Sequence, residues 1–248
     1  MLLFSLGRNP DFLLATSSWH PTPDNYRDVL GAGSFHILAY LRNSVIVSAA
    51  SAVLVTIIAG FSGYALTRLK FPGRRVIPVA LLAISMFPQI SIVGYLYKLM
   101  TSMNWINTYQ ALIFPYTAIA LPLAIWLMMS YLSQIPRDLD NAALIDGATR
   151  LQILRRVIIP VAAPGVFSTL IIAFILCFNE FMFALILTVD FSARTIPVGI
   201  ALFTGLHGQI PYGQIMAAAV VAIAPVIVLT ALFQRRIIQG LAGGAIKG

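Results

Sequence analysis

Residues 43–67, NSVIVSAASAVLVTIIAGFSGYALT, form an apolar run without one charged side chain. A bilayer core about 30 Å thick requires about 20 mostly apolar residues of helix, so the run is long enough to cross a membrane. A strand is disfavoured, because lipid requires every backbone group to be paired and the run lacks the alternation of a barrel strand. The sequence therefore predicts a membrane-spanning helix here.

The same pattern recurs along the chain of 248 residues, of which 59% are apolar and 10% are charged. In average soluble domains about 45–50% of the residues are apolar and about 25% are charged, so this composition excludes a water-soluble globular protein. It also excludes intrinsic disorder, which requires low hydrophobicity and high charge. We therefore expect an all-α membrane protein, a polytopic helical bundle. Besides the first run, four stretches are apolar enough to span: residues 76–98, 109–132, 165–189 and 214–233.

The basic residues predict the orientation of the spans. Most of the 16 lysines and arginines lie in the loops at 68–75 and 133–164 and in the carboxy-terminal tail. The positive-inside rule places these segments, and with them the carboxy-terminus, in the cytoplasm. The net charge of +8 does not indicate a nucleic-acid partner, because the basic residues form short clusters between apolar runs rather than one basic face.

The amino-terminal segment, residues 1–42, is then expected to be external, and residues 43–248 to form the transmembrane domain. Residues 1–6 are too short to span a bilayer and too short for a signal peptide. We interpret them as the end of a further, first span. The alternative is that the segment is short enough to be translocated together with the following helix.

The loop at residues 133–164 is long and has its own helical pattern. Pro136 suits a first helical position, and Asp146-Gly147 favours a turn. Apolar residues at helical spacing precede and follow that turn: Leu139, Ala142, Ala143, Leu151, Leu154 and Ile158. The loop predicts two short helices at a bend. On physical grounds it is either an amphipathic segment lying in the lipid headgroups or a docking element for a partner protein.

The usual signatures of catalysis are missing from the sequence. Cys177 is the one cysteine, and the three histidines are scattered without metal-ligand spacing. The sequence contains neither a phosphate-binding loop nor a nucleophile elbow. We therefore predict that the chain is not an enzyme and binds no metal or cofactor itself, so that any ATP chemistry is supplied by another chain.

The stretch from Asn141 to Ala148, followed by Val157-Ile158-Ile159-Pro160, resembles the EAA loop of binding-protein-dependent ABC importer permeases. Ala142, Ala143, Gly147 and Pro160 match that motif in register. Asn141 stands where the family usually has Glu, and the adjacent Asp140 is a candidate to substitute for it in part. The resemblance assigns the contact with the ATPase to Asp140, Asn141, Ala142, Ala143, Asp146, Gly147, Ala148 and Thr149.

Other stretches are similar to the maltose-type carbohydrate permeases of that family, from about Pro21 to Gly248. They are Pro23-Asp24-Asn25-Tyr26, Asn43-Ser44, Tyr64-Ala65-Leu66-Thr67-Arg68, Phe71-Pro72-Gly73-Arg74, Leu112-Ile113-Phe114-Pro115-Tyr116, Asn179-Glu180-Phe181 and the ending Gln239 to Gly248.

The resemblance implies a type I ABC importer permease in the inner membrane that imports a di- or oligosaccharide or a sugar-like osmolyte. It implies a second homologous permease subunit, two ATPase subunits that use ATP and Mg, and an extracytoplasmic sugar-binding protein, with membrane lipids around the spans. In that family the loop forms a coupling helix seated on the ATPase. The alternatives are a secondary transporter subunit, which would need coupling-ion residues and usually an internal repeat, and a structural membrane scaffold, which would not require the bent loop.

Polar residues inside the predicted spans are candidates for the substrate path. Glu180 is the carboxylate well inside a span, where burial costs about 2.5–3.5 kcal/mol even on permissive scales, so it should face the interior of the bundle. Glu180 and Asn179 either bind sugar hydroxyls or make a structural bond between subunits. Pro88 is expected to interrupt the second span, which places Gln89 and Ser91 on the path or at a packing kink.

Overall fold

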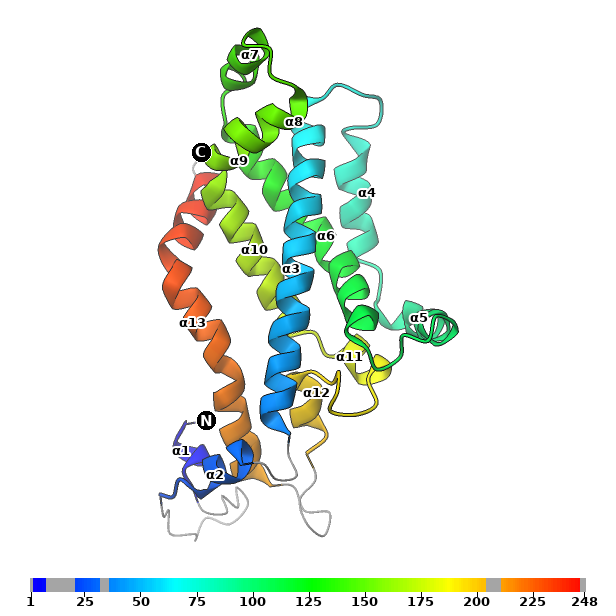
Figure 1. Ribbon diagram of the computed structural model, residues 1–248, viewed down its shortest axis with the longest axis vertical. Coiled ribbons are helices and arrows are strands. Elements are labelled where there is room, and N and C mark those ends of the chain that lie inside the picture. The colour runs from blue at the N-terminus through cyan, green and yellow to red at the C-terminus, as the bar shows by residue number, and fades with distance from the viewer. Residues whose placement is uncertain (1, 8–20, 32–35, 204–210, 246–248) are drawn as a thin grey trace. The chain divides into compact units, whose positions relative to one another are not determined.

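The computed structural model describes residues 2–7, 21–31, 36–203 and 211–245 of the chain. In these residues the regular structure is helical, apart from one isolated bridge (Figure 1). The helices, in chain order, are α1 (Leu2–Ser5), α2 (Asp24–Leu30), α3 (Ile37–Arg68), α4 (Val76–Ser85), α5 (Ile90–Ser102), α6 (Tyr109–Gln134), α7 (Asp138–Ile145), α8 (Arg150–Ile153), the π-helical segment η1 (Leu154–Ile158), α9 (Ile159–Val161), α10 (Ala163–Phe178), α11 (Met182–Leu187), α12 (Ile196–Ala201) and α13 (Tyr212–Ala245).

Three helices are each long and apolar enough to cross a membrane alone: α3, α6 and the Tyr212–Phe233 part of α13. They contain three of the predicted spans, and these predictions are confirmed. Two interrupted pairs pass the same test, α4 with α5 and Arg150–Val161 with α10. The described residues therefore hold three to five candidate spans.

The two remaining predicted spans are not continuous helices. Residues 76–98 are divided between α4 and α5, and the break includes Pro88, as its missing N–H predicts. The expectation of one helix over residues 165–189 is wrong, because α10 ends at Phe178 and α11 begins at Met182. The polar residues Asn179 and Glu180 therefore lie in the connection before α11 and not inside a continuous helix.

The chain divides into two compact units, each built from segments that are distant in sequence. The first unit comprises Met1–Val47, Val93–Leu112 and Asn179–Val228, and the second comprises Ser48–Ile92, Ile113–Phe178 and Leu229–Gly248. The boundary predicted between residues 42 and 43 concerns the membrane surface rather than these units, and it stays a prediction.

The first unit is held together at the start of α3 by the fully buried Asn43. Its amide nitrogen donates to the carbonyl oxygens of Phe191 (2.9 Å) and Arg194 (3.0 Å), and its carbonyl oxygen accepts from the Tyr109 hydroxyl (2.7 Å). The next residue, Ser44, accepts from the Ile196 backbone N–H at 2.8 Å. All the hydrogen-bonding groups of the Asn43 side chain are thus used inside the unit, which fixes the loop before α12 against α3.

The second unit contains close helix contacts at glycines. A Cβ added at Gly63 of α3 would lie 2.9 Å from the Cγ of Met128 on α6, and one added at Gly165 would overlap the ring of Tyr131. At Gly63, the absence of a side chain thus lets α3 and α6 lie close together. Gly60 differs, because nothing lies within 4 Å of its added Cβ.

Candidate functional site

The predicted pair of short helices in the loop after α6 is confirmed. Helix α7 ends at Ile145, a turn follows, and the chain continues through α8, η1 and α9 before bending by 82° into α10. In Figure 1, α7 and α8 lie beyond the end of α3 at which Arg68 stands. Helix α7 begins at Asp138, two residues after the Pro136 that the sequence favours as its first residue.

The turn between α7 and α8 depends on Gly147. Its φ angle is +80°, a left-handed conformation that other residues adopt at a cost, and nothing lies within 4 Å of an added Cβ. The N–H groups of Gly147 and Ala148 donate to the carbonyl oxygens of Leu144 and Ala143, each at 3.0 Å. The glycine therefore reverses the chain and satisfies the carbonyl groups at the end of α7.

The outer surface of this loop combines polar and large apolar side chains. Asn141, Ala142 and Asp146 are exposed, and Ile145 is 87% exposed. Leu139, Leu144 and Leu151 are also exposed, by 38%, 36% and 47%. We call these seven residues the coupling surface: Leu139, Asn141, Ala142, Leu144, Ile145, Asp146 and Leu151.

The residues of the second predicted stripe divide between the surface and the interior. Leu154 and Ile158 are buried, whereas Leu151 is exposed, and Ile153 is also buried. The π-helical geometry from Leu154 to Ile158 changes the residue spacing that a regular helix would give, a local feature often found at functional sites.

Helix α7 is fastened to the last turn of α3 by a buried ion pair. The Arg68 Nε and the Asp140 Oδ2 lie 3.2 Å apart, and the two side chains are 4% and 6% exposed. The Tyr64 hydroxyl donates to the Asp140 Oδ1 at 3.2 Å, and the Arg68 Nη2 donates to the Ile135 carbonyl oxygen at 2.7 Å. Outside this cluster, Arg137 donates from its exposed guanidinium to the Thr67 carbonyl oxygen at 3.1 Å.

Asp140, the candidate to stand in for the missing Glu, is buried. Its carboxylate is directed to Tyr64 and Arg68 of the same chain, so it positions α7, and its part in the ATPase contact stays a prediction. Sequence reasoning missed Tyr64 and Arg68. Their spacing of four residues at the end of a span places them on one helix face, and this was the available signal.

Thr149 caps the start of α8. Its hydroxyl accepts from the Gln152 N–H, and the Gln152 side chain accepts from the Thr149 N–H at 2.8 Å, which forms a capping box at the start of α8. Of the eight residues assigned to the ATPase contact, five are exposed (Asn141, Ala142, Asp146, Gly147 and Thr149), Ala143 and Ala148 are half-buried, and Asp140 is buried.

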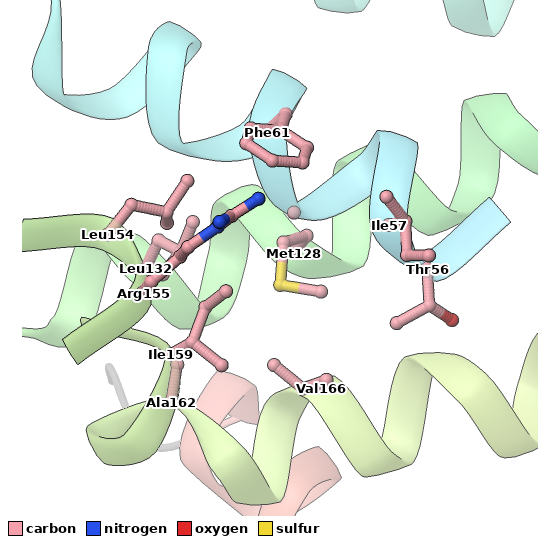
Figure 2. Close-up of a pocket in the computed structure, with 11 residues that line it drawn as sticks. Thr56, Ile57, Phe61, Met128, Leu132, Leu154, Arg155, Ile159, Ala162 and Val166 are labelled. Atoms are coloured by element: carbon pink, nitrogen blue, oxygen red, sulfur yellow. The ribbon is translucent and has the colours of Figure 1, made fainter. Parts of the chain in front are cut away.

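A pocket of about 290 Å³ lies between the second half of the loop and helices α3, α6 and α10 (Figure 2). Arg155 brings a charge to a lining that is mostly apolar, and in Figure 2 its side chain reaches from η1 toward Phe61 of α3. Met128 and Val166 line the pocket from α6 and α10. The second half of the loop therefore lines this pocket together with three longer helices of its own unit.

Glu180 lies at the break between α10 and α11 and is 7% exposed. Its Oε1 accepts from the Phe183 N–H at 2.9 Å, and its Oε2 accepts from the Ala184 N–H at 3.2 Å. These are the first N–H groups of α11, which have no partner inside the helix. The structure thus gives Glu180 the role of a helix cap, within its own chain.

We expect Glu180→Gln to lower the free energy of unfolding by about 0.5–2 kcal/mol, because an amide offers one acceptor where the carboxylate offers two to the α11 N–H groups. Thermal unfolding of the purified protein measures this loss. In the sugar importer that the resemblance implies, the sugar concentration that half-stimulates ATP hydrolysis should stay unchanged. Unchanged stability with a shifted half-stimulation would instead make Glu180 a ligand of the sugar.

The other three candidates for the substrate path are exposed in the chain. Asn179 follows the last residue of α10, Gln89 lies in the break before α5, and Ser91 is in the first turn of α5. Asn179 and Glu180 belong to the first compact unit, and Gln89 and Ser91 belong to the second. A role in the path stays a prediction for all four.

In the first unit, hydrogen bonds that sequence reasoning missed join the α5–α6 connection to the segment after α11. We call the residues concerned, Asn107, Val189, Asp190 and Ser192, the polar clamp. Asn107 has a φ angle of +63°, and its Oδ1 accepts from the Val189 N–H at 3.0 Å. Its Nδ2 donates to the Asp190 Oδ1 at 3.0 Å and to the Ser192 Oγ at 2.9 Å. The hydrogen bonds from Ser192 and Asn107 lower the pKa of Asp190 from 3.8 to about 2.

The clamp predicts acid sensitivity of this loop. The pKa of Asp190 is lower in the folded state than in the unfolded chain, so its stabilising effect is present above about pH 4 and is lost as the pH falls toward about 2. We expect the difference in unfolding temperature between the wild type and Asp190→Asn to shrink over this range. Asp146→Asn is the control, because Asp146 lies outside the clamp. A difference that does not change with pH would contradict the prediction.

Comparison with known proteins identifies relatives along almost the whole chain. Residues 52–243 match the family described as binding-protein-dependent transport system inner membrane component. The chain is 48% identical to the trehalose/maltose transport system permease protein MalG of Thermococcus litoralis, over 100% of this chain and 90% of that protein. It is 40% identical to the trehalose transport system permease protein SugB of Mycobacterium tuberculosis, over 99% of this chain and 90% of that protein.

A solved structure has the same fold. It is a chain of a bacterial ABC transporter involved in the import of the acidic polysaccharide alginate. The TM-score is 0.77 at 20% sequence identity, and the match covers 94% of this chain and 87% of the other. At this identity the likeness establishes the fold, which confirms the expected helical architecture of a type I importer permease.

Proposed function

This chain belongs to the family of inner membrane components of binding-protein-dependent transport systems, and on that premise we propose that it imports a disaccharide such as trehalose or maltose. The chain is a multi-pass membrane transport subunit and not an enzyme, and ATP hydrolysis belongs to a partner ATPase. The observation that carries the choice of sugar is the 48% identity to a trehalose/maltose permease over the entire chain.

The proposed assembly contains this chain, a second homologous permease, two ATPase subunits and an external sugar-binding protein. The two permeases form the translocation pathway together, so this chain supplies half of it. The coupling surface defined above docks on the ATPase in the cytoplasm. Its exposed leucines and Ile145 support this role, because large apolar side chains projecting from a short cytoplasmic helix fit burial against a protein partner.

The ion pair between Arg68 and Asp140 gives the coupling surface a mechanical connection to the membrane. A displacement of α7 by the ATPase is passed to the end of α3 through a buried contact rather than through a flexible loop. The second half of the loop also lies next to the helices of this unit, because η1, α3, α6 and α10 line one pocket. The ATPase cycle thereby changes the arrangement of the spans and the side from which the sugar site is open.

Reconstitution of the complete importer in vesicles tests the function and the substrate together. We expect trehalose or maltose, delivered by the binding protein, to stimulate ATP hydrolysis and sugar uptake. Transport by the purified chain alone would overturn the proposal. So would ATP hydrolysis that responds to no sugar of this class.

A single cysteine placed on the coupling surface tests its orientation and its partner. Cys177 is buried and is replaced by Ser, and Ile145→Cys introduces one exposed thiol. We expect a membrane-impermeant maleimide to label this thiol only after the cells are permeabilised, and the assembled ATPase to protect it. Labelling from outside intact cells would reverse the proposed topology. Equal labelling with and without the ATPase would remove the docking role.

A further inference from the structure

A groove of about 360 Å³ in the second unit lies away from the coupling surface, where the end of α3 and the start of α4 meet α6. Two arginines that directly precede the first residue of α4 line it, together with Thr67 and apolar side chains. The residues that carry the argument are Arg74, Arg75, Leu66, Val79, Trp126 and Met129.

The groove extends from the end of the helices into the depth of the spans. Trp126 precedes the last residue of α6, Gln134, by eight positions, which corresponds to about 12 Å along a helix at about 1.5 Å per residue. Arg74 and Arg75 lie in the connection between α3 and α4, and a basic connection between two apolar helices is expected at the membrane surface. A ligand that fills the groove therefore has a polar end in the headgroup layer and an apolar body in the hydrocarbon.

The charges at the polar end favour an anion. Arg74 donates to the Leu69 carbonyl oxygen at 3.3 Å, and Arg75 is exposed. Neither guanidinium forms a salt bridge in the part of the chain that the structure describes. Two adjacent arginines without a carboxylate partner are suited to a phosphate group, which accepts several hydrogen bonds from guanidinium donors.

The walls of the groove suit an acyl chain. Trp126 is 47% exposed and Val79 is 64% exposed, although neither side chain faces water in a membrane-embedded helix. Basic pockets between spans, with apolar walls, are the form in which membrane proteins hold anionic lipid headgroups. Water-soluble anions would gain nothing from the indole of Trp126, so the whole lining indicates a lipid.

We propose that this groove binds one anionic phospholipid, with its phosphate at Arg74 and Arg75 and an acyl chain along Val79 and Trp126. The site goes beyond the transport function, and it rests on the proposed topology only in assigning the lipid to the cytoplasmic leaflet. A bound lipid at this position holds the first turn of α4 against the end of α3 and against α6.

Fluorescence quenching in vesicles tests the site, with the assembled importer as the sample. The probe is phosphatidylglycerol with brominated acyl chains, titrated into phosphatidylcholine, and the reverse titration uses brominated phosphatidylcholine. The signal of Trp126 is the difference between the wild type and Trp126→Phe. We expect half-maximal quenching at a mole fraction of phosphatidylglycerol about fivefold lower than that of phosphatidylcholine, in line with the attraction of a basic residue to an anionic surface.

Charge variants decide the outcome. Arg74→Gln/Arg75→Gln should abolish the preference, whereas Arg235→Gln/Arg236→Gln, which removes two arginines that follow the apolar Tyr212–Phe233 part of α13, should retain it. Equal quenching by both lipids would overturn the proposal, because the groove would then hold ordinary surrounding lipid. Absence of quenching would also overturn it, since a protein segment would then cover the groove. Neither outcome depends on sugar transport, so failure of the site is distinguishable from failure of the proposed function.

Discussion

Replacing Gly147 with proline is expected to abolish sugar-stimulated ATP hydrolysis by the importer while the chain still inserts into the membrane. Proline fixes φ near about −65°, whereas Gly147 has a φ angle of +80°. Proline also removes the N–H that donates to the Leu144 carbonyl oxygen. The turn between α7 and α8 cannot form, and the coupling surface is dispersed. The measurement is the rate of ATP hydrolysis in reconstituted vesicles with and without sugar and binding protein.

Gly73 provides the matched control for this variant. Its φ angle is +83°, nothing lies within 4 Å of an added Cβ, and it lies in the α3–α4 connection rather than in the coupling loop. Gly73→Pro should therefore leave the stimulation in place. Gly147→Ala meets no neighbouring atom and carries a left-handed strain of about 1–2 kcal/mol, so a partial loss is expected. Equal loss in the Gly73 and Gly147 proline variants would show a general backbone effect and contradict the coupling role.

Much of the fold could be predicted from the sequence, because lipid imposes a simple requirement on the spans. Long uncharged runs predicted α3, α6 and the Tyr212–Phe233 part of α13, and Pro88 predicted the break before α5. The break after α10 could not be predicted from hydropathy. At this break the Glu180 carboxylate accepts hydrogen bonds from the free N–H groups of α11. Hydropathy averaged over the surrounding residues gives no sign of such a contact between a side chain and the backbone.

The turn of the candidate site could be predicted from the sequence, but the contacts that hold the site to the rest of the chain could not. The Asp146-Gly147 pair correctly placed the turn, because a left-handed position favours glycine whatever surrounds it. Asp140 has no such local signature. Whether a carboxylate in the first turn of an exposed helix faces a partner or its own chain depends on Arg68, 72 positions earlier, and that pairing is set by tertiary structure. The same holds for Asn107, whose partners lie beyond α11.

Breaking the ion pair between Arg68 and Asp140 is expected to give the largest loss of stability among single substitutions in the loop. Arg68→Met leaves the Asp140 carboxylate buried without its cation, and Asp140→Leu leaves the guanidinium buried without its anion. Removal of one partner from a buried pair costs about 3–5 kcal/mol. Because the pair holds α7 to α3, we expect both variants to lose coupling as well, so that ATP hydrolysis no longer responds to the sugar. Thermal unfolding and stimulated ATP hydrolysis measure the two effects.

The double variant Arg68→Met/Asp140→Leu separates a positioning role from simple stability. Two apolar side chains in place of a buried pair often restore the free energy of unfolding, so the double variant should be more stable than either single variant. Its coupling should recover with the attachment of α7, since the contact rather than the charge carries the movement. Arg137→Gln is the control, because its guanidinium is exposed and its loss should cost less than about 1 kcal/mol. Restored stability without restored coupling would show that coupling needs the charged pair itself. Additive losses of stability in the double variant would show that the two side chains do not act as a pair.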